Sequence, residues 1–204
     1  MAKKAIVLLA EGFEEVEAVT PVDYLRRAGV EVTTAAVGGK GTDAGGRGTD
    51  AGGDRVVRGA RGIPVTADAV LGDLVRQGRA GAESWDAVIL PGGMPGASNL
   101  AASGETGALL KAMAAAGRVV AAICASPAVV LAPLGLLAGR SFTCYPGMEK
   151  QVSGAKWSGD RVVIDGNFVT SRGAGTAGEF AAALIGRLLS PAEGKKVAAA
   201  VLLA

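Results

Sequence analysis

The sequence predicts an α/β fold in which a mostly parallel sheet carries helices on both faces. Short uncharged apolar runs of strand length alternate with longer stretches of helical spacing, and glycine or proline separates them. Half of the 204 residues are hydrophobic and a fifth are charged, which is typical of a globular protein with a sizeable core. Such alternation favours parallel strands joined by crossover helices.

The N-terminal part begins with a strand and a helix. The run 5–9 is short and apolar, as expected for a central strand of a parallel sheet. From Val16 to Ala28, apolar side chains recur at helical spacing until Gly29 ends the helix. The β-branched run 30–36 predicts a second strand.

Segment 38–62 interrupts this alternation, since ten of its 25 residues are glycine and the hexapeptide Gly-Thr-Asp-Ala-Gly-Gly occurs at 41–46 and 48–53. So little apolar surface predicts a mobile surface hairpin or loop, inserted into a single domain that spans 1–204. A phosphate-binding loop is the alternative. The segment lacks the Gly-Lys-Ser/Thr ending of such loops, and no clear helix follows it.

Regular alternation resumes at residue 68. The pattern predicts helices over 68–77, 99–116, 128–131, 176–189 and from 191 onward. It predicts strands over 86–90, 119–123, 161–164 and 168–170, the last two joined by the hairpin signal Asp165-Gly166.

No feature of the chain indicates a membrane or nucleic-acid partner. Segment 119–139 has 21 residues without a charge, enough to cross a bilayer, but Pro127 and Pro133 favour a buried strand, turn and helix. The apolar stretch 5–10 is too short for a signal peptide, so we expect a cytoplasmic protein. The formal net charge is only +2, and no basic run is interleaved with aromatic residues.

The chain has two cysteines, Cys124 and Cys144, and no histidine. Two cysteines are too few for a disulfide scaffold, so free thiols in a reducing compartment are expected. The lack of histidine excludes Cys-His and Ser-His-Asp catalysis within the chain, and it excludes histidine-based zinc sites.

Cys124 lies between a predicted strand and a predicted helix that has Pro127 in its first turn. A helix N-terminus stabilises a thiolate, so this position predicts a lowered thiol pKa. A tight strand-to-helix turn also exposes a side chain, as in the nucleophile elbow. The alternative is an inert buried cysteine.

Two further features follow strands. Pro91-Gly92-Gly93 fits either an oxyanion hole, in which amides face a reacting oxygen at close range, or an ordinary turn. Acids such as Glu17 early in a helix offset the helix dipole. If Glu17 instead points toward Cys124, the two groups titrate as a pair, and a protonated Glu17 moves a proton during catalysis. These features meet only if their strands are neighbours.

Several motifs in the same order resemble the ThiJ/PfpI family of the class I glutamine amidotransferase-like superfamily, and within it the Parkinsonism-associated deglycase and glyoxalase III branch. They are Glu11-Gly-Phe-Glu-Glu-Val-Glu17, Pro21-Val-Asp23, Arg26-Arg-Ala-Gly29, Leu90-Pro-Gly-Gly93, Asn99-Leu100, Ala121-Ala-Ile-Cys-Ala125, Thr170-Ser-Arg-Gly-Ala-Gly-Thr176 and Glu179-Phe180. The resemblance covers nearly the whole chain except the glycine-rich insertion.

The resemblance implies a flavodoxin-like three-layer sandwich, a homodimer, and chemistry without a cofactor or metal. It implies that Cys124 is the nucleophile, that Glu17 is its hydrogen-bonded partner, and that the amides of Gly93 and Ala125 form the oxyanion hole, beside Gly92. Further residues expected to line the site are Arg61, Cys144, Tyr145, Ser171 and Arg172.

The chain departs from many relatives at one position, because Tyr145 stands where they carry a histidine before the proline that corresponds to Pro146. A tyrosine is a poor base near neutral pH. This argues strongly against a peptidase, and less against a glyoxalase, which needs a nucleophile and one proton shuttle.

Three functions follow as hypotheses. The first is a glyoxalase, with related deglycase activity, acting on methylglyoxal, glyoxal or their adducts. The second is a cysteine-based oxidative-stress sensor or redox-regulated chaperone, with Cys144 as a resolving thiol if it lies close to Cys124. The third is a binding protein with an inert cysteine.

Overall fold

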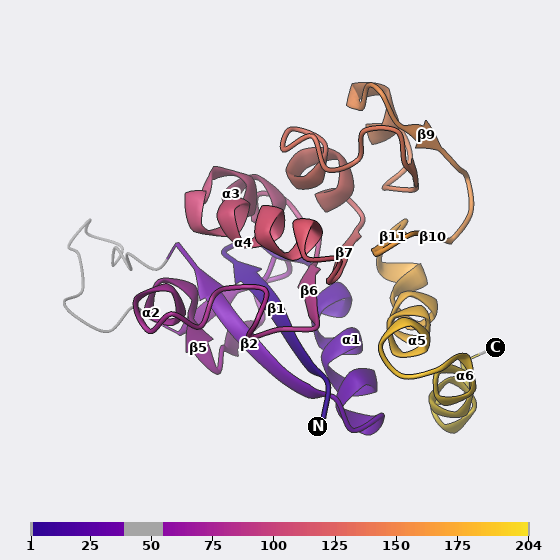
Figure 1. Cartoon of the computed structure of the whole chain (residues 1–204), viewed down its shortest axis with the longest axis horizontal. Coiled ribbons are helices and arrows are strands. Elements are labelled where there is room, and N and C mark those ends of the chain that lie inside the picture. Colours follow the sequence, from indigo (N-terminus) through magenta and orange to yellow (C-terminus); the bar gives the residue numbers. More distant parts are fainter. Residues whose placement is uncertain (1, 39–54, 204) are drawn as a thin grey trace.

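The computed structural model of the chain describes residues 2–38 and 55–203. Its main sheet has seven strands in the order β10-β11-β7-β6-β1-β2-β5, and only the β10–β11 pair is antiparallel (Figure 1). This mostly parallel sheet confirms the predicted α/β, flavodoxin-like class. The strands are β1 (Lys4–Ala10), β2 (Glu31–Val37), β5 (Ala69–Val70), β6 (Ala87–Leu90), β7 (Val119–Ile123), β10 (Val162–Asp165) and β11 (Phe168–Ser171).

Helices cover both faces of this sheet, which explains why its central strands are apolar throughout. Ile6 and Leu8 of β1 point into one core cluster, and Val7 and Leu9 point into the other. The first cluster includes residues of α2 (Leu71–Arg76), α3 (Gly96–Ala102) and α4 (Gly104–Ala115). The second includes residues of α1 (Glu15–Arg27), α5 (Ala177–Leu188) and α6 (Pro191–Ala200), which gather on the other side in Figure 1.

The strand order brings four carboxyl ends together. Strand β1 pairs with β6, β6 with β7, and β7 with β11, all in parallel, so the segments that follow these strands leave the sheet at one edge. The chain passes from β1 to β2 on one side and later enters β6 on the other side. Ligands of open α/β sheets bind at such a reversal of strand order.

Part of the predicted glycine-rich insertion forms a hairpin. Strand β3 (Val56–Arg58) pairs antiparallel with β4 (Pro64–Thr66), and Gly62 between them has φ of +85°. A positive φ favours glycine, which fits a tight turn at this position. Residues 39–54, with both copies of the hexapeptide, lie outside the described residues.

Two predicted helices differ from the structure. Residues 68–77 do not form one helix, because Ala69 and Val70 pair with β2 as strand β5 before α2 begins. The predicted helix 99–116 is two helices that meet at Ser103, whose extended backbone ends α3 and whose Oγ accepts a hydrogen bond from the Thr106 amide at 3.1 Å. Sheet pairing and capping outweigh helix propensity at these two places.

The uncharged stretch 119–139 is confirmed as a buried strand, a turn and a short helical segment. Strand β7 is followed by a π-helical turn, η1 (Pro127–Leu131). Among the described residues, no helix is both long and apolar enough to cross a membrane. The remaining elements are β8 (Ser141–Phe142), η2 (Met148–Gln151), β9 (Lys156–Trp157) and η3 (Ala174–Thr176).

Candidate active site

Cys124 follows β7 directly, on a strained turn. Its φ is 65°, in the left-handed region that residues with a Cβ rarely adopt. Hydrogen bonds hold this conformation, because the Cys124 amide donates to the Ser171 carbonyl at 2.9 Å and its carbonyl accepts from the Tyr145 amide at 2.8 Å. The backbone therefore turns sharply here and leaves the thiol half-buried at the edge of the sheet.

A buried serine links this turn to the neighbouring strand. Ser126 Oγ donates a hydrogen bond of 2.6 Å to the carbonyl of Pro91, the first residue after β6. The bond fixes the Cys124 turn relative to Gly92 and Gly93. No role for Ser126 was predicted from the sequence, because its partner lies 35 residues away in the chain.

Glu17 lies in the first turn of α1 and points inward, with 1% of its surface exposed. Its Oε2 accepts a hydrogen bond of 2.8 Å from the Gly92 amide, and the carboxyl is also hydrogen-bonded to the Cys124 thiol. Burial raises the pKa of Glu17 to about 7; the two hydrogen bonds act against this, and the charge of Glu14 adds to it. Near neutral pH, a Glu17 with this pKa is present in both protonation states, as proton transfer requires.

The sequence predicted a lowered pKa for Cys124. This prediction is wrong when the neighbouring Glu17 is ionised. Burial raises the pKa of Cys124 to about 12, and the charge and hydrogen bond of Glu17 contribute further. Amide hydrogen bonds from Gly93 and Ala125 act in the opposite direction. The following helical element is a turn of five residues, too short to outweigh burial. Two acids in contact titrate as a pair, so a proton on Glu17 removes the repulsion that opposes the thiolate.

The glycines after β6 have different roles. The amides of Gly93 and Ala125 both donate to the Cys124 sulfur and so favour its thiolate. Their role as an oxyanion hole for a substrate oxygen stays a prediction. Gly92 instead donates its amide to Glu17, so it is not an oxyanion donor in this structure. A Cβ on Gly92 would lie 2.6 Å from Cys124 Cβ and 2.8 Å from Glu17 Oε2, so only glycine fits between the two side chains.

A cavity of about 640 Å³ opens over the thiol. Arg61 and Tyr145 line it as predicted; Tyr145 is 52% exposed, and Arg61 Nη2 lies 3.8 Å from Glu14 Oε2. The predicted residues Glu17, Gly93, Cys124 and Ala125 line it as well. Six lining residues were not predicted as site residues: Glu14, Ala60, Met94, Pro146, Met148 and Ala174. Ala60, Met94 and Pro146 each adjoin a predicted site residue in the sequence, which is the one local signal for them.

Three predicted lining residues lie elsewhere. Cys144 is fully buried and packs in the core cluster of α3 and α4, whereas Cys124 packs against the cluster of α1 and α5. Ser171 Oγ bonds to the Arg161 carbonyl and Thr176 Oγ1, and Arg172 donates to the Gly159 carbonyl. Cys144 is therefore poorly placed as a resolving thiol, and burial raises its pKa to about 11.

The described residues contain no group of three or more histidine, cysteine, aspartate or glutamate side chains that could hold a metal ion.

A thiol on a sharp strand-to-helix turn, at the carboxyl edge of a parallel sheet, defines a nucleophile-elbow protein of the α/β class. Comparison with known proteins identifies the group within this class. The chain belongs to the DJ-1/PfpI family, whose family model matches residues 3–187. This confirms the family resemblance of the sequence motifs.

Individual relatives match over most of their length. The Parkinson disease protein 7 homolog of Danio rerio is 39% identical, over 98% of this chain and 94% of the relative. The glutathione-independent glyoxalase DJR-1.2 of Caenorhabditis elegans is 35% identical, over 93% of this chain and 90% of the relative. The structure of oxidized Toxoplasma gondii DJ-1 superimposes with a TM-score of 0.86 at 39% identity, and all of both chains is covered.

Proposed function

We propose that the chain is a cofactor-independent glyoxalase with related deglycase activity, acting on methylglyoxal, glyoxal or their adducts. The observation that carries this proposal is the hydrogen-bonded pair of Cys124 and Glu17 under a cavity of about 640 Å³, with a Glu17 pKa of about 7. A relative at 35% identity is named a glutathione-independent glyoxalase, which supports the same substrate class.

The proposed reaction adds water to the dicarbonyl overall. The Cys124 thiol gives its proton to ionised Glu17 as the sulfur attacks the aldehyde carbon of methylglyoxal, and the resulting oxyanion takes this proton from Glu17 to give a hemithioacetal. Glu17 removes the proton from this carbon and returns it to the neighbouring carbon through an enediol, which leaves a thioester of lactate. Water then releases lactate and the free thiol. The amides of Gly93 and Ala125 stabilise the oxyanion.

The cavity composition fits a small dicarbonyl better than a peptide. Tyr145 supplies a hydroxyl, Met94 and Met148 supply apolar walls, and Arg61 is a cation at the rim. The chain contains no histidine to protonate the leaving amine of a peptide. The conversion of methylglyoxal to lactate has no leaving amine to protonate.

The test is to incubate the pure protein with methylglyoxal, without glutathione, and to quantify lactate beside a Cys124→Ser control. We expect lactate from the wild type and loss of about a thousandfold or more in the variant, because the nucleophile forms the covalent intermediate. Absence of lactate from folded wild-type protein contradicts the proposal.

A second candidate is an oxidative-stress sensor or redox-regulated chaperone that uses the same thiol. It is favoured by the relative from Toxoplasma gondii, whose structure is described as oxidized. Oxidation of Cys124 to a sulfinic acid would place new oxygens beside the Gly93 and Ala125 amides and Glu17. Mass spectrometry after mild peroxide tests it: oxygen addition confined to exposed methionines such as Met94 contradicts this role.

We also propose that the chain forms a homodimer in the cytoplasm. Val16 and Val19 on α1 are 48% and 50% exposed, and such half-exposed apolar side chains suit a partner surface. Light scattering should give twice the 20.1 kDa mass of one chain, and Val19→Glu should shift the protein toward that single mass. A monomeric wild type contradicts the dimer, and imaging of the tagged full chain tests its location.

A further inference from the structure

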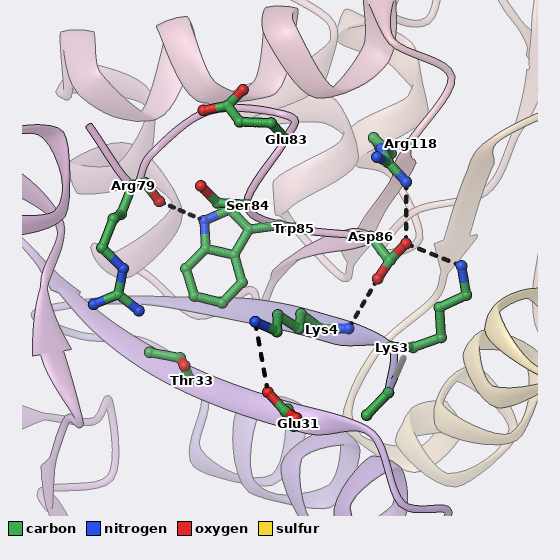
Figure 2. Close-up of a pocket in the computed structure, with 11 residues that line it drawn as sticks. Lys3, Lys4, Glu31, Thr33, Arg79, Glu83, Ser84, Trp85, Asp86 and Arg118 are labelled. Carbon is green, nitrogen blue, oxygen red and sulfur yellow. Dashed lines mark hydrogen bonds and ion pairs between the residues drawn. The ribbon is translucent and has the colours of Figure 1, made fainter. Parts of the chain in front are cut away.

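A second cavity, of about 470 Å³, lies at the opposite edge of the sheet, where the central strands begin (Figure 2). Lys4 at the start of β1 and Thr33 of β2 form one side of it. Arg79, Trp85 and Asp86, which precede β6, form another. The proposed reaction at Cys124 uses none of these residues.

Two cationic side chains face this cavity with little to neutralise them. The guanidinium of Arg79 and the ammonium of Lys4 lie on either side of the Trp85 indole in Figure 2. The Arg79 guanidinium has no hydrogen bond or ion pair with any residue that the structure describes. Among the described residues, Lys4 Nζ has one ion-pair partner, Glu31 Oε2 at 3.9 Å, and the side chains of this pair are 54% and 62% exposed. A pair so exposed is weak and readily exchanged for a ligand.

Asp86 does not neutralise these two cations, because its oxygens are already occupied. Asp86 Oδ1 accepts from Lys3 Nζ and from Arg118 Nη1, each at 3.0 Å, and Oδ2 accepts from the Lys4 backbone amide at 3.0 Å. One carboxylate therefore binds two cations. The cavity lining carries four cationic and three acidic side chains, which leaves a net positive charge.

The remaining groups select for hydroxyls. The carboxylate of Glu31 and the hydroxyls of Thr33 and Ser84 line the same space, and carboxylates accept hydrogen bonds from sugar hydroxyls. Arginine and lysine bind phosphate oxygens through charge-assisted hydrogen bonds. The volume lies within the range of about 300–1,000 Å³ that is typical of small-molecule sites, and it exceeds what an inorganic ion fills.

We propose that this cavity binds a hydroxyl-bearing phosphate monoester, with the phosphate between Arg79 and Lys4 and the sugar hydroxyls toward Glu31 and Ser84. The ligand is a free sugar phosphate or the sugar-phosphate part of a nucleotide. The site is distinct from Cys124, so ligand binding does not require turnover there.

Tryptophan fluorescence provides a direct test. The chain has two tryptophans, and Trp157 lies outside the cavity and is 48% exposed, so Trp157→Phe leaves Trp85 as the sole reporter. Titration with ribose 5-phosphate should change the Trp85 emission saturably, and calorimetry should give the same dissociation constant. Arg79→Met should weaken binding about tenfold or more, since it removes a charge-assisted contact to phosphate.

A matched control is Arg76→Met, because the Arg76 guanidinium bonds to Asp73 and does not line the cavity. This variant should bind like the parent, as should Cys124→Ser. The Arg79 substitution leaves the hydrogen bond from Trp85 Nε1 to the Arg79 backbone carbonyl in place, so the fold should be kept. Equal melting temperatures of the two arginine variants check this.

Comparing the affinities of two phosphate esters shows which class of ligand the cavity binds. Adenosine 5′-monophosphate that binds more tightly than ribose 5-phosphate identifies a nucleotide as the ligand, and the reverse identifies a free sugar phosphate. The proposal is overturned if calorimetry detects no binding of either ester, if inorganic phosphate binds as tightly as the esters, or if Arg79→Met binds like Arg76→Met.

Discussion

Glu17 and Asp86 are acids at opposite edges of the same sheet, and their surroundings shift their pKa values in opposite directions. Glu17, beyond the carboxyl end of β1, is buried next to a thiol and near a second acid, and its pKa rises to about 7. Asp86, at the amino end of β6, meets Lys3, Arg118 and the Lys4 amide. Burial also acts to raise the pKa of Asp86, but these hydrogen bonds and charges outweigh it, and the pKa is lowered.

The difference shows how one sheet keeps one acid suitable for proton transfer and another permanently charged. A buried carboxyl without a cation retains its proton up to near neutral pH, whereas a carboxyl between two cations is ionised throughout the physiological range. The first arrangement suits catalysis, and the second holds two cations in fixed positions. Substitutions at both edges test this comparison.

The largest effect is expected from Glu17→Gln on turnover. Glutamine keeps an oxygen that accepts from the Gly92 amide but has no proton to transfer, so lactate formation from methylglyoxal should fall about a hundredfold or more. Glu105→Gln is the control, since Glu105 is exposed on α4 and does not line the Cys124 cavity. Full turnover of the Glu17 variant would refute the role of Glu17 as the proton carrier.

The same variant should change the pH dependence of stability. Because the folded pKa of Glu17 is raised from 4.5 to about 7, its contribution is present below pH 4.5 and is lost as the pH rises through about 7. As the pH rises from 4.5 to about 7, the free energy of unfolding of the wild type should therefore fall by up to about 3 kcal/mol relative to that of Glu17→Gln. Urea unfolding of both proteins at several pH values measures this difference. Free energies of unfolding that changed with pH in the same way in both proteins would contradict the raised pKa of Glu17.

Gly92→Ala should disturb the packing of Cys124 and Glu17 without removing the thiol or the carboxyl. The new Cβ would meet Cys124 Cβ and Glu17 Oε2 at 2.6 and 2.8 Å, and overpacking of this kind costs about 1–3 kcal/mol. Gly104→Ala is the matched control, because a Cβ added to Gly104 on α4 would meet nothing within 4 Å. Equal free energies of unfolding for the two alanine variants would show that the Gly92 site has room to relax.

The smallest effect is expected from Asp86→Asn. Because the pKa of Asp86 is lowered from 3.8, its contribution to stability is present above about pH 4 and is lost as the pH falls through the folded pKa. The variant should be less stable by roughly 1 kcal/mol near pH 7, and the difference should shrink in strong acid, opposite to Glu17→Gln. A difference that grew in acid would contradict the comparison.

The central elements of the fold were predictable because their signals are local. The run 119–123 is apolar and is followed by a cysteine and a helix-starting Pro127. Neighbouring residues are therefore enough to predict the strand and the turn at Cys124. The break at Ser103 was missed although a serine is a good N-cap, because the surrounding alanine and leucine pattern continues through it.

The contents of the site were less predictable, because its members come from distant parts of the chain. Family motifs indicated Cys124 and Glu17, and the structure brings them into contact. Cys144 illustrates the limit, since it adjoins Tyr145 in sequence but points into the core on the other side of the sheet. Whether a side chain faces the cavity depends on strand register and on the direction of the backbone at that residue.

The sequence by itself determined the α/β class, the family and the position of the thiol on a tight turn, because periodicity, glycines and motifs are local properties. Only the tertiary structure decided that β1, β6, β7 and β11 are neighbours and that Gly92 donates to Glu17. It also decided that the Cys124 pKa rises where a helix N-terminus alone would lower it. Burial and the charges of distant residues set a pKa, and both arise only when the chain is folded.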